Sequence, residues 1–211
     1  MEHLISLGHE IVPVSLPRTP QALSAYYVLA PAEASSNLAR YDGVRYGHRH
    51  ENDRSKEDSI LFAPTRATGF GDEVRRRILL GAYTLSAGAM DNYFLKAQSV
   101  RRLVQQDFDN VFYIRNPLRE GSDLVNEGGV DAILAPCALG TAPTLEEVRG
   151  VERAVDGYVN DALTVPASLG GVPAVSLPVE TEEGSVGMQV ITQWGDEEML
   201  WRVSAEIEKM S

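Results

Sequence analysis

Apolar residues recur along residues 69–112 with the period of an α-helix, in two consecutive stretches. The first stretch has three apolar residues and a glycine on one face: Val74, Ile78, Gly81 and Leu85. The second carries a longer apolar stripe: Met90, Phe94, Ala97, Val100, Val104, Phe108 and Val111. Gly69, Gly71 and Asp72 suit the entry to the first stretch, and Gly88 lies near the break between the two. The pattern therefore predicts two consecutive helices that serve as a spine for the chain.

The residues before this spine predict a helix, a strand and a second helix. Residues 1–8 are typical of the end of a helix, and residues 9–16 of a short strand. Pro13 makes that strand an edge strand or an irregular one, because proline cannot donate to a ladder. Thr19, followed by proline, predicts a helix start, and the helix continues towards Leu38.

Polar segments connect these elements. Residues 41–47 read as a loop with two glycines, and residues 48–68 as an exposed, charged loop. Residues 115–129 form a further polar connection.

The rest of the chain alternates strand and helix patterns. Strands are predicted over 131–136, 172–179 and 186–192, and helices over 144–148, 156–164 and 197–210. The last two strands flank a turn at 180–185 and form a hairpin. Interleaved helices and strands predict an α/β protein with a mixed sheet flanked by helices.

Composition narrows the class of protein. A chain of 211 residues with 44% hydrophobic residues fits one globular domain, or a lobe of a larger one. No apolar run approaches the roughly 20 residues of a spanning helix, so no membrane partner is expected. Cys137 is the only cysteine, which excludes an internal disulfide. The net charge of −11 argues against a main nucleic-acid-binding surface, which is usually basic.

Four long blocks carry a family resemblance: EASSNLARYDGVRYGHR (33–49), GFGDEVRRRILLG (69–81), LKAQSVRRL (95–103) and YVNDALTVPASLGGVPAVSLP (158–178). With these blocks the chain resembles the amidase signature family, and most closely its glutamyl-tRNA(Gln) amidotransferase A subunits. The resemblance implies that residues 1–211 form a single incomplete amidase-like domain. This domain would be the C-terminal portion of the family's fold, without the N-terminal catalytic part.

The family's nucleophile is a serine activated through a second serine and a lysine. A free hydroxyl is a weak nucleophile and needs such a neighbouring base. Ser35 and Ser36 have no flanking glycine, and Lys56, Lys96 and Lys209 do not lie in the family's catalytic context. We therefore predict no catalytic residue in this chain, and no activity of the chain alone.

Substrate-binding residues are implied by the resemblance at Tyr26 in SAYYVLAP, Arg77 in VRRRILLG and Asp161 in YVNDALT. These residue types suit free glutamine: a guanidinium fork for the α-carboxylate, a carboxylate for the α-ammonium and a hydroxyl for one more hydrogen bond. Helical geometry points Arg76 away from the buried face and lets Arg77 flank it. Each residue also has a purely structural interpretation. Arg77 would be a surface charge, Tyr26 a core aromatic residue, and Asp161 a residue that caps or solvates a helix end.

Metal and cofactor sites are not expected. His48 and His50 have no carboxylate or cysteine at a recognised ligand spacing. Cys137 has no histidine in a catalytic pattern, which favours a structural role.

The resemblance also implies a function. The whole enzyme would hydrolyse glutamine and supply ammonia for converting Glu-tRNA(Gln) to Gln-tRNA(Gln) in translation. Its expected partners are glutamine, a small third subunit and a B-type subunit, with tRNA held mainly by the B-type partner. The expected location is the mitochondrial matrix, with the cytoplasm as the alternative. Two other functions stay open: a fragment of a general amidase, and a non-catalytic truncated amidase-like binding protein.

Overall fold

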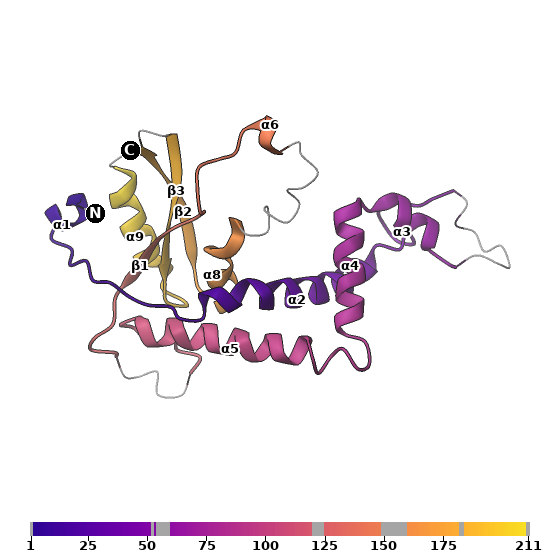
Figure 1. Cartoon of the computed structure of the whole chain (residues 1–211), viewed down its shortest axis with the longest axis horizontal. Coiled ribbons are helices and arrows are strands. Elements are labelled where there is room, and N and C mark those ends of the chain that lie inside the picture. Colours follow the sequence, from indigo (N-terminus) through magenta and orange to yellow (C-terminus); the bar gives the residue numbers. More distant parts are fainter. Residues whose placement is uncertain are drawn as a thin grey trace. The chain divides into compact units, whose positions relative to one another are not determined.

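The computed structural model describes residues 2–51, 53, 60–119, 125–148, 160–181 and 184–209 (Figure 1). It divides into two compact units, one formed by Met1–Leu23 with Val100–Ser211 and the other by Ser24–Ser99. Helices and strands interleave along the chain, which confirms the α/β class. That residues 1–211 form a single incomplete domain stays a prediction.

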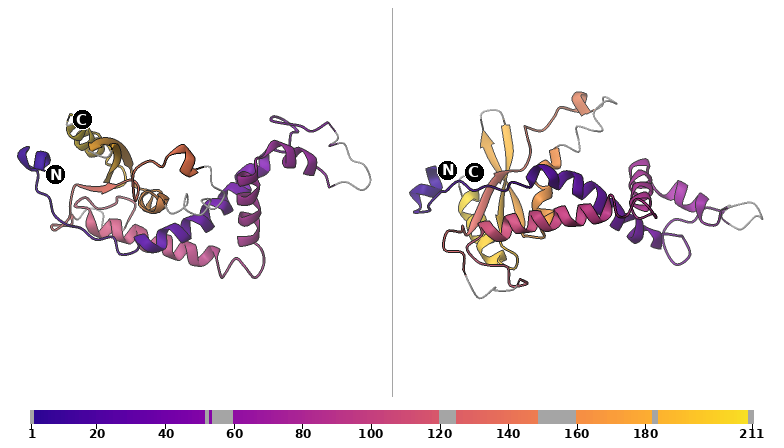
Figure 2. Two further views of the ribbon diagram at one scale, coloured as in Figure 1. Left: turned by 45° about the horizontal axis from the view of Figure 1, so that its top comes forward. Right: turned by 60° about the horizontal axis from the view of Figure 1, so that its bottom comes forward.

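The larger unit is built on a small sheet. Its strands are β1 (Ala132–Pro136), β2 (Ala174–Thr181) and β3 (Gly184–Thr192), in the order β1-β3-β2, with antiparallel pairing throughout. The right-hand view of Figure 2 shows β2 and β3 side by side, as the predicted hairpin requires. The strands extend further into the predicted turn than expected, since the ladder reaches the pair Thr181 and Gly184.

Helix α9 (Glu197–Glu208) contacts all three strands and supplies half of a small apolar core (Figure 1). Leu200 and Ile207 from this helix pack with Val190 from β3 and with Leu4 from α1 (Glu2–Ser6). Asp196 caps α9, because its Oδ1 accepts from the Met199 N–H at 3.3 Å. The predicted amphipathic helix at 197–210 is confirmed, and two residues of its apolar face, Leu200 and Ile207, are buried against the sheet.

Residues 9–16 do not form the predicted strand. Prolines at positions 13 and 17 remove two of the donors that a ladder needs. The segment is held instead by side chains: His9 Nε2 lies 2.6 Å from Glu206 Oε2 on α9, and Ile11 packs against the apolar core.

The second half of α5 (Phe94–Val111) also belongs to the larger unit. Phe108 and Phe112 stack with ring centroids 6.1 Å apart and are almost fully buried. Phe108 packs against Gly170, where an added Cβ would lie 2.8 Å from its ring. Gly170 ends helix α8 (Val165–Gly170), so α5 and α8 are in close contact.

Helix α8 was not predicted. Most of the helix predicted at 156–164 lies outside the described residues, and its described end is a short 3₁₀ turn, η3 (Asn160–Ala162). A new helix then starts at Val165, with Pro166 in its first turn. Proline is tolerated there because the first helical N–H groups have no intrahelical partner. The prediction at 144–148 is confirmed by α6 (Leu145–Val148).

The smaller unit is helical. It contains most of α2 (Thr19–Asn37), followed by η1 (Leu38–Arg40), and α4 (Asp72–Thr84) with the start of α5. The helix start at Thr19 and the two consecutive helices predicted within residues 69–112 are confirmed.

The prediction of an exposed loop over 48–68 was wrong at its end. Residues from Ala63 to Gly69 form helix α3, and Asp53 and Thr65 are buried. The Asp53 carboxylate accepts from the Phe62 N–H at 3.0 Å and from the Thr65 hydroxyl. Polar groups of this segment thus bond to one another, which composition alone does not reveal.

Candidate substrate-binding site

Arg77 lies on α4, one turn before a close crossing with α2. At Gly81 an added Cβ would lie 1.9 Å from the Pro31 carbonyl oxygen, so the two helix backbones touch there (Figure 1). Glycine is required because any side chain would enter the backbone of α2. Arg77 precedes the contact by four residues, or about 6 Å along the helix axis.

Three neighbouring arginines lie on α4. As the helical pattern predicts, the side chain of Arg76 is more exposed than that of Arg77. The side chain of Arg76 is 64% exposed and that of Arg77 is 41% exposed. Glu73 pairs with both, and its Oε1 lies 2.9 Å from Arg77 Nε. Arg75 pairs with Asp72 instead. An ion pair to Nε orients the guanidinium plane of Arg77, which is the group that the hypothesis assigns to substrate.

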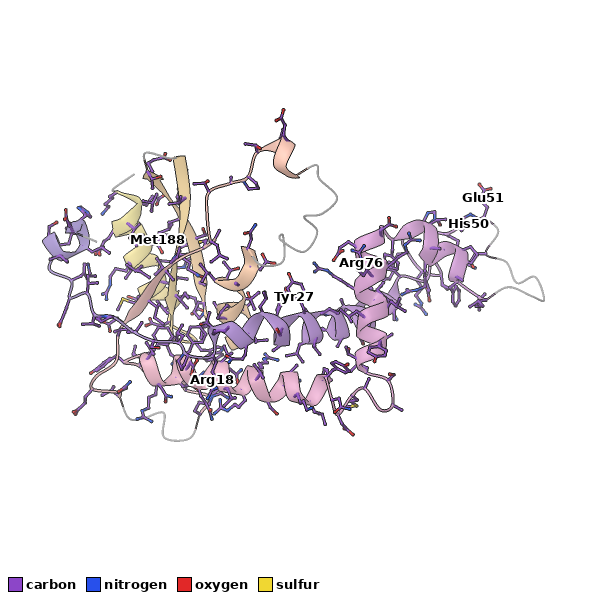
Figure 3. All side chains as sticks on the ribbon, viewed as in Figure 1. Arg18, Tyr27, His50, Glu51, Arg76 and Met188 are labelled. Atoms are coloured by element: carbon purple, nitrogen blue, oxygen red, sulfur yellow. The ribbon has the colours of Figure 1, made fainter. Side chains whose placement is uncertain are left out.

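Tyr26 lies on α2, five residues before Pro31, or about 8 Å along that helix. It is half-buried, and its ring meets that of Tyr27 edge to face, with centroids 5.4 Å apart. Figure 3 labels the neighbouring residue on each helix, Tyr27 on α2 and Arg76 on α4. The structure therefore places Tyr26 and Arg77 on two helices of the same unit, each within about two turns of their crossing.

Asp161 lies in the larger unit, within η3, and is exposed. Its main-chain carbonyl accepts from the Thr164 N–H at 3.2 Å and from the Thr164 hydroxyl at 3.3 Å. These bonds are local to the turn that leads into α8. The convergence of Asp161 with Tyr26 and Arg77 stays a prediction, because Asp161 belongs to the other unit.

Two residues of α5 hold the opposite end of α8. Arg101 Nε donates to the Leu169 carbonyl at 3.0 Å, and Gln105 Nε2 donates to the Gly170 carbonyl at 3.3 Å. The last carbonyls of a helix have no intrahelical donor, so these side chains supply it. Sequence reasoning did not single out either residue. The only available signal was that both are polar residues within the LKAQSVRRL block or just after it.

Other candidate groups form ordinary structural contacts. The Ser35 hydroxyl donates to the Ala32 carbonyl of its own helix at 2.8 Å. Cys137 Sγ, just after β1, lies 3.0 Å from Ser176 Oγ on β2, and the two side chains meet over Gly187 of the intervening strand β3. His48 Nε2 bonds to Thr68 Oγ1 at 2.8 Å. In the described part of the chain, no three His, Cys, Asp or Glu side chains group as metal ligands, and no helix is long and apolar enough to span a membrane.

Comparison with known proteins identifies strong relatives. A family model described as Amidase matches residues 1–201. The mitochondrial A subunit of glutamyl-tRNA(Gln) amidotransferase from Tuber melanosporum is 59% identical over 99% of this chain, which corresponds to 43% of that protein. The same protein of Neurospora crassa is 50% identical over 97% of this chain, or 44% of its own length. The chain thus spans less than half the length of these relatives.

The fold of the chain is also similar to that of a solved structure. The crystal structure of the A subunit of glutamyl-tRNA(Gln) amidotransferase from Thermotoga maritima is similar over 100% of this chain and 37% of that protein. The TM-score is 0.62 and the sequences are 33% identical. The arrangement of helices and strands described above is therefore one that a solved protein of this kind also adopts.

Proposed function

The chain belongs to the amidase family, and from this premise we propose that it is the C-terminal, glutamine-binding segment of the A subunit of a glutamyl-tRNA(Gln) amidotransferase. The whole protein hydrolyses the side-chain amide of glutamine to glutamate and ammonia. The ammonia then converts Glu-tRNA(Gln) to Gln-tRNA(Gln) for translation. The observation that carries this proposal is the 59% identity to such a protein over 99% of the chain.

The residue types of the candidate site support an amino-acid amide as substrate. Arg77 presents a planar fork that matches the α-carboxylate of glutamine. Asp161 pairs with the α-ammonium, and the Tyr26 hydroxyl makes one further hydrogen bond. A hydrophobic amide has neither charge and gains nothing from Arg77 or Asp161. The three residues thus favour glutamine over the substrates of a general amidase.

The partners follow from the same proposal. The chain acts with a small third subunit and with a B-type subunit, which makes most of the tRNA contacts. The net charge of −11 supports this division, because an acidic chain repels the phosphates of tRNA. The protein works in the mitochondrial matrix, as the names of its fungal relatives suggest.

The test is the substrate preference of the full-length protein assembled with its partner subunits. We expect kcat/KM for L-glutamine to exceed that for valeramide, an uncharged amide of similar length, by at least about a hundredfold. Asp161→Asn and Arg77→Ala should each reduce this ratio. Equal hydrolysis of the two amides would make the protein a general amidase and overturn the proposal.

A further inference from the structure

Gln189 is a buried polar residue in the central strand of the sheet. It is 3% exposed and pairs in register with Ala135 of β1 and Ser176 of β2. Figure 3 labels its neighbour on β3, Met188. A buried amide in this position is costly unless its hydrogen bonds are made, so the partners of its side chain show what it does.

The side-chain amide of Gln189 joins two separate segments. Its Nε2 donates to the Pro136 carbonyl at 3.0 Å and to the Leu163 carbonyl at 2.8 Å. An amide NH₂ group has two N–H donors, so both are used. Pro136 belongs to the neighbouring strand β1, whereas Leu163 lies outside the sheet, between η3 and α8. Gln189 therefore fastens the Leu163 backbone to the centre of the sheet.

Leu163 is two residues from Asp161, and the intervening backbone is a tight turn. The bonds from Thr164 to the Asp161 carbonyl close this turn, so Asp161 moves with the backbone that Gln189 holds. At the far end of α8, Arg101 and Gln105 hold the last carbonyls. The segment that carries Asp161 is thus fastened at both ends by side chains from other elements.

We propose that Gln189 is a positioning residue for the substrate: by holding the Leu163 carbonyl, it sets the Asp161 carboxylate where it receives the α-ammonium of glutamine. This inference rests on the proposed function. Gln189 does not touch the substrate and acts only through Asp161. Its loss should therefore impair the recognition of the ammonium group and leave the chemistry at the amide unchanged.

The experiment compares two substrates in the full-length protein with its partner subunits. Glutaramate has the amide and the carboxylate of glutamine but no α-ammonium. Gln189→Met removes both N–H donors and keeps a similar volume. We expect KM for L-glutamine to rise about tenfold with kcat changed less than about threefold. The kcat/KM for glutaramate should change less than about threefold, because Asp161 has no ammonium to hold.

Gln193→Met is the matched control. Gln193 is also buried, at 1% exposed, and its Nε2 donates to the Ile114 carbonyl at 3.2 Å. Its Oε1 accepts from the Trp194 N–H. It lies just past the end of the same strand, and its side chain bonds to these two residues rather than to the turn that carries Asp161. Gln193→Met should lower the melting temperature and leave the ratio of kcat/KM for glutamine to that for glutaramate unchanged.

The outcomes separate this inference from the proposed function. A parallel loss for both substrates in Gln189→Met would show a role in folding only and overturn the inference. If Asp161→Asn abolishes the preference for glutamine and Gln189→Met does not, the inference fails and the proposed function stands. If Asp161→Asn has no effect, the assignment of Asp161 is wrong and the inference fails with it. Should Gln189→Met not fold, Gln189→Asn, which keeps the amide but shortens its reach, gives the same comparison.

Discussion

Replacing Gly81 with alanine tests the contact between α2 and α4 on which the geometry at Tyr26 and Arg77 depends. In an isolated helix this change would stabilise, because alanine is favoured over glycine by about 1 kcal/mol. In this structure the new Cβ would lie 1.9 Å from the Pro31 carbonyl oxygen and 2.5 Å from its carbon. The two effects have opposite signs, so the measured change in stability shows which one dominates.

The overlap should dominate. A carbon and an oxygen in ordinary contact are separated by about 3.3 Å, so the helices would have to part by more than about 1 Å. The two Pro31 atoms that the new Cβ would overlap belong to the backbone, so no change of side-chain rotamer can relieve the clash. Overpacking of this kind costs about 1–3 kcal/mol, occasionally more. Because the overlap at 1.9 Å is severe and with backbone, we expect the upper end of this range, about 3 kcal/mol. After the gain of about 1 kcal/mol in helix propensity, the net loss in the free energy of unfolding should be about 2 kcal/mol.

The assay is urea denaturation of the full-length protein, followed by far-UV circular dichroism, with Gly140→Ala as the control. Nothing lies within 4 Å of a Cβ added at Gly140, so this variant should change stability by less than about 0.5 kcal/mol. In the full-length protein, Gly81→Ala should also raise KM for glutamine, because it separates the helices that carry Tyr26 and Arg77. A midpoint for Gly81→Ala equal to or above that of the unmodified chain would refute the reasoning.

Three further predictions concern the site and the surface. Arg77→Ala should weaken glutamine binding by an amount near the low end of about 2–5 kcal/mol, because the Arg77 side chain is 41% exposed. Arg77→Lys should also weaken binding, because lysine lacks the planar guanidinium that bonds both carboxylate oxygens. Arg76→Ala should cost under about 0.5 kcal/mol, and equal effects at the two positions would remove the geometric argument. The isolated chain should show no amide turnover, and a trapped acyl-enzyme would contradict this. The chain should also bind a hydrophobic dye and self-associate, because its described residues expose many large apolar side chains, among them Ile60, Leu79, Leu118, Leu145 and Trp201. A cooperatively folded monomer without dye binding would count against this prediction.

The elements that could be predicted from sequence are those whose signal is local. The apolar stripe of α5 predicts its buried face correctly, since Ala97, Val104 and Phe108 are buried, and the turn between the two apolar runs predicts the hairpin of β2 and β3. Thr19 with the following proline marked the start of α2 correctly. The difference in exposure between Arg76 and Arg77 also follows from helical period, because both positions lie on one regular helix.

The elements that could not be predicted depend on distant partners. Helix α3 lies in a charged segment in which the buried Asp53 carboxylate accepts hydrogen bonds from Phe62 and Thr65. Hydrophobic periodicity does not indicate hydrogen bonds of this kind. Helix α8 starts beside a proline, which in the sequence indicates the end of a helix as readily as the first turn of a new one. The role of Gln189 could not be predicted from the sequence. Its partners are the main-chain carbonyls at positions 136 and 163, which any residue type can supply.

The candidate residues are therefore held in different ways, and this predicts where remote substitutions will matter. Tyr26 and Arg77 lie on long helices joined by a backbone contact, so their positions depend chiefly on the absence of a side chain at Gly81. Asp161 lies on a short 3₁₀ turn that has little stability of its own. Its position depends on side chains that reach the turn from elsewhere, among them Gln189. Substitution of Gln189 should thus affect recognition of the α-ammonium, whereas added bulk at Gly81 should affect recognition of the α-carboxylate.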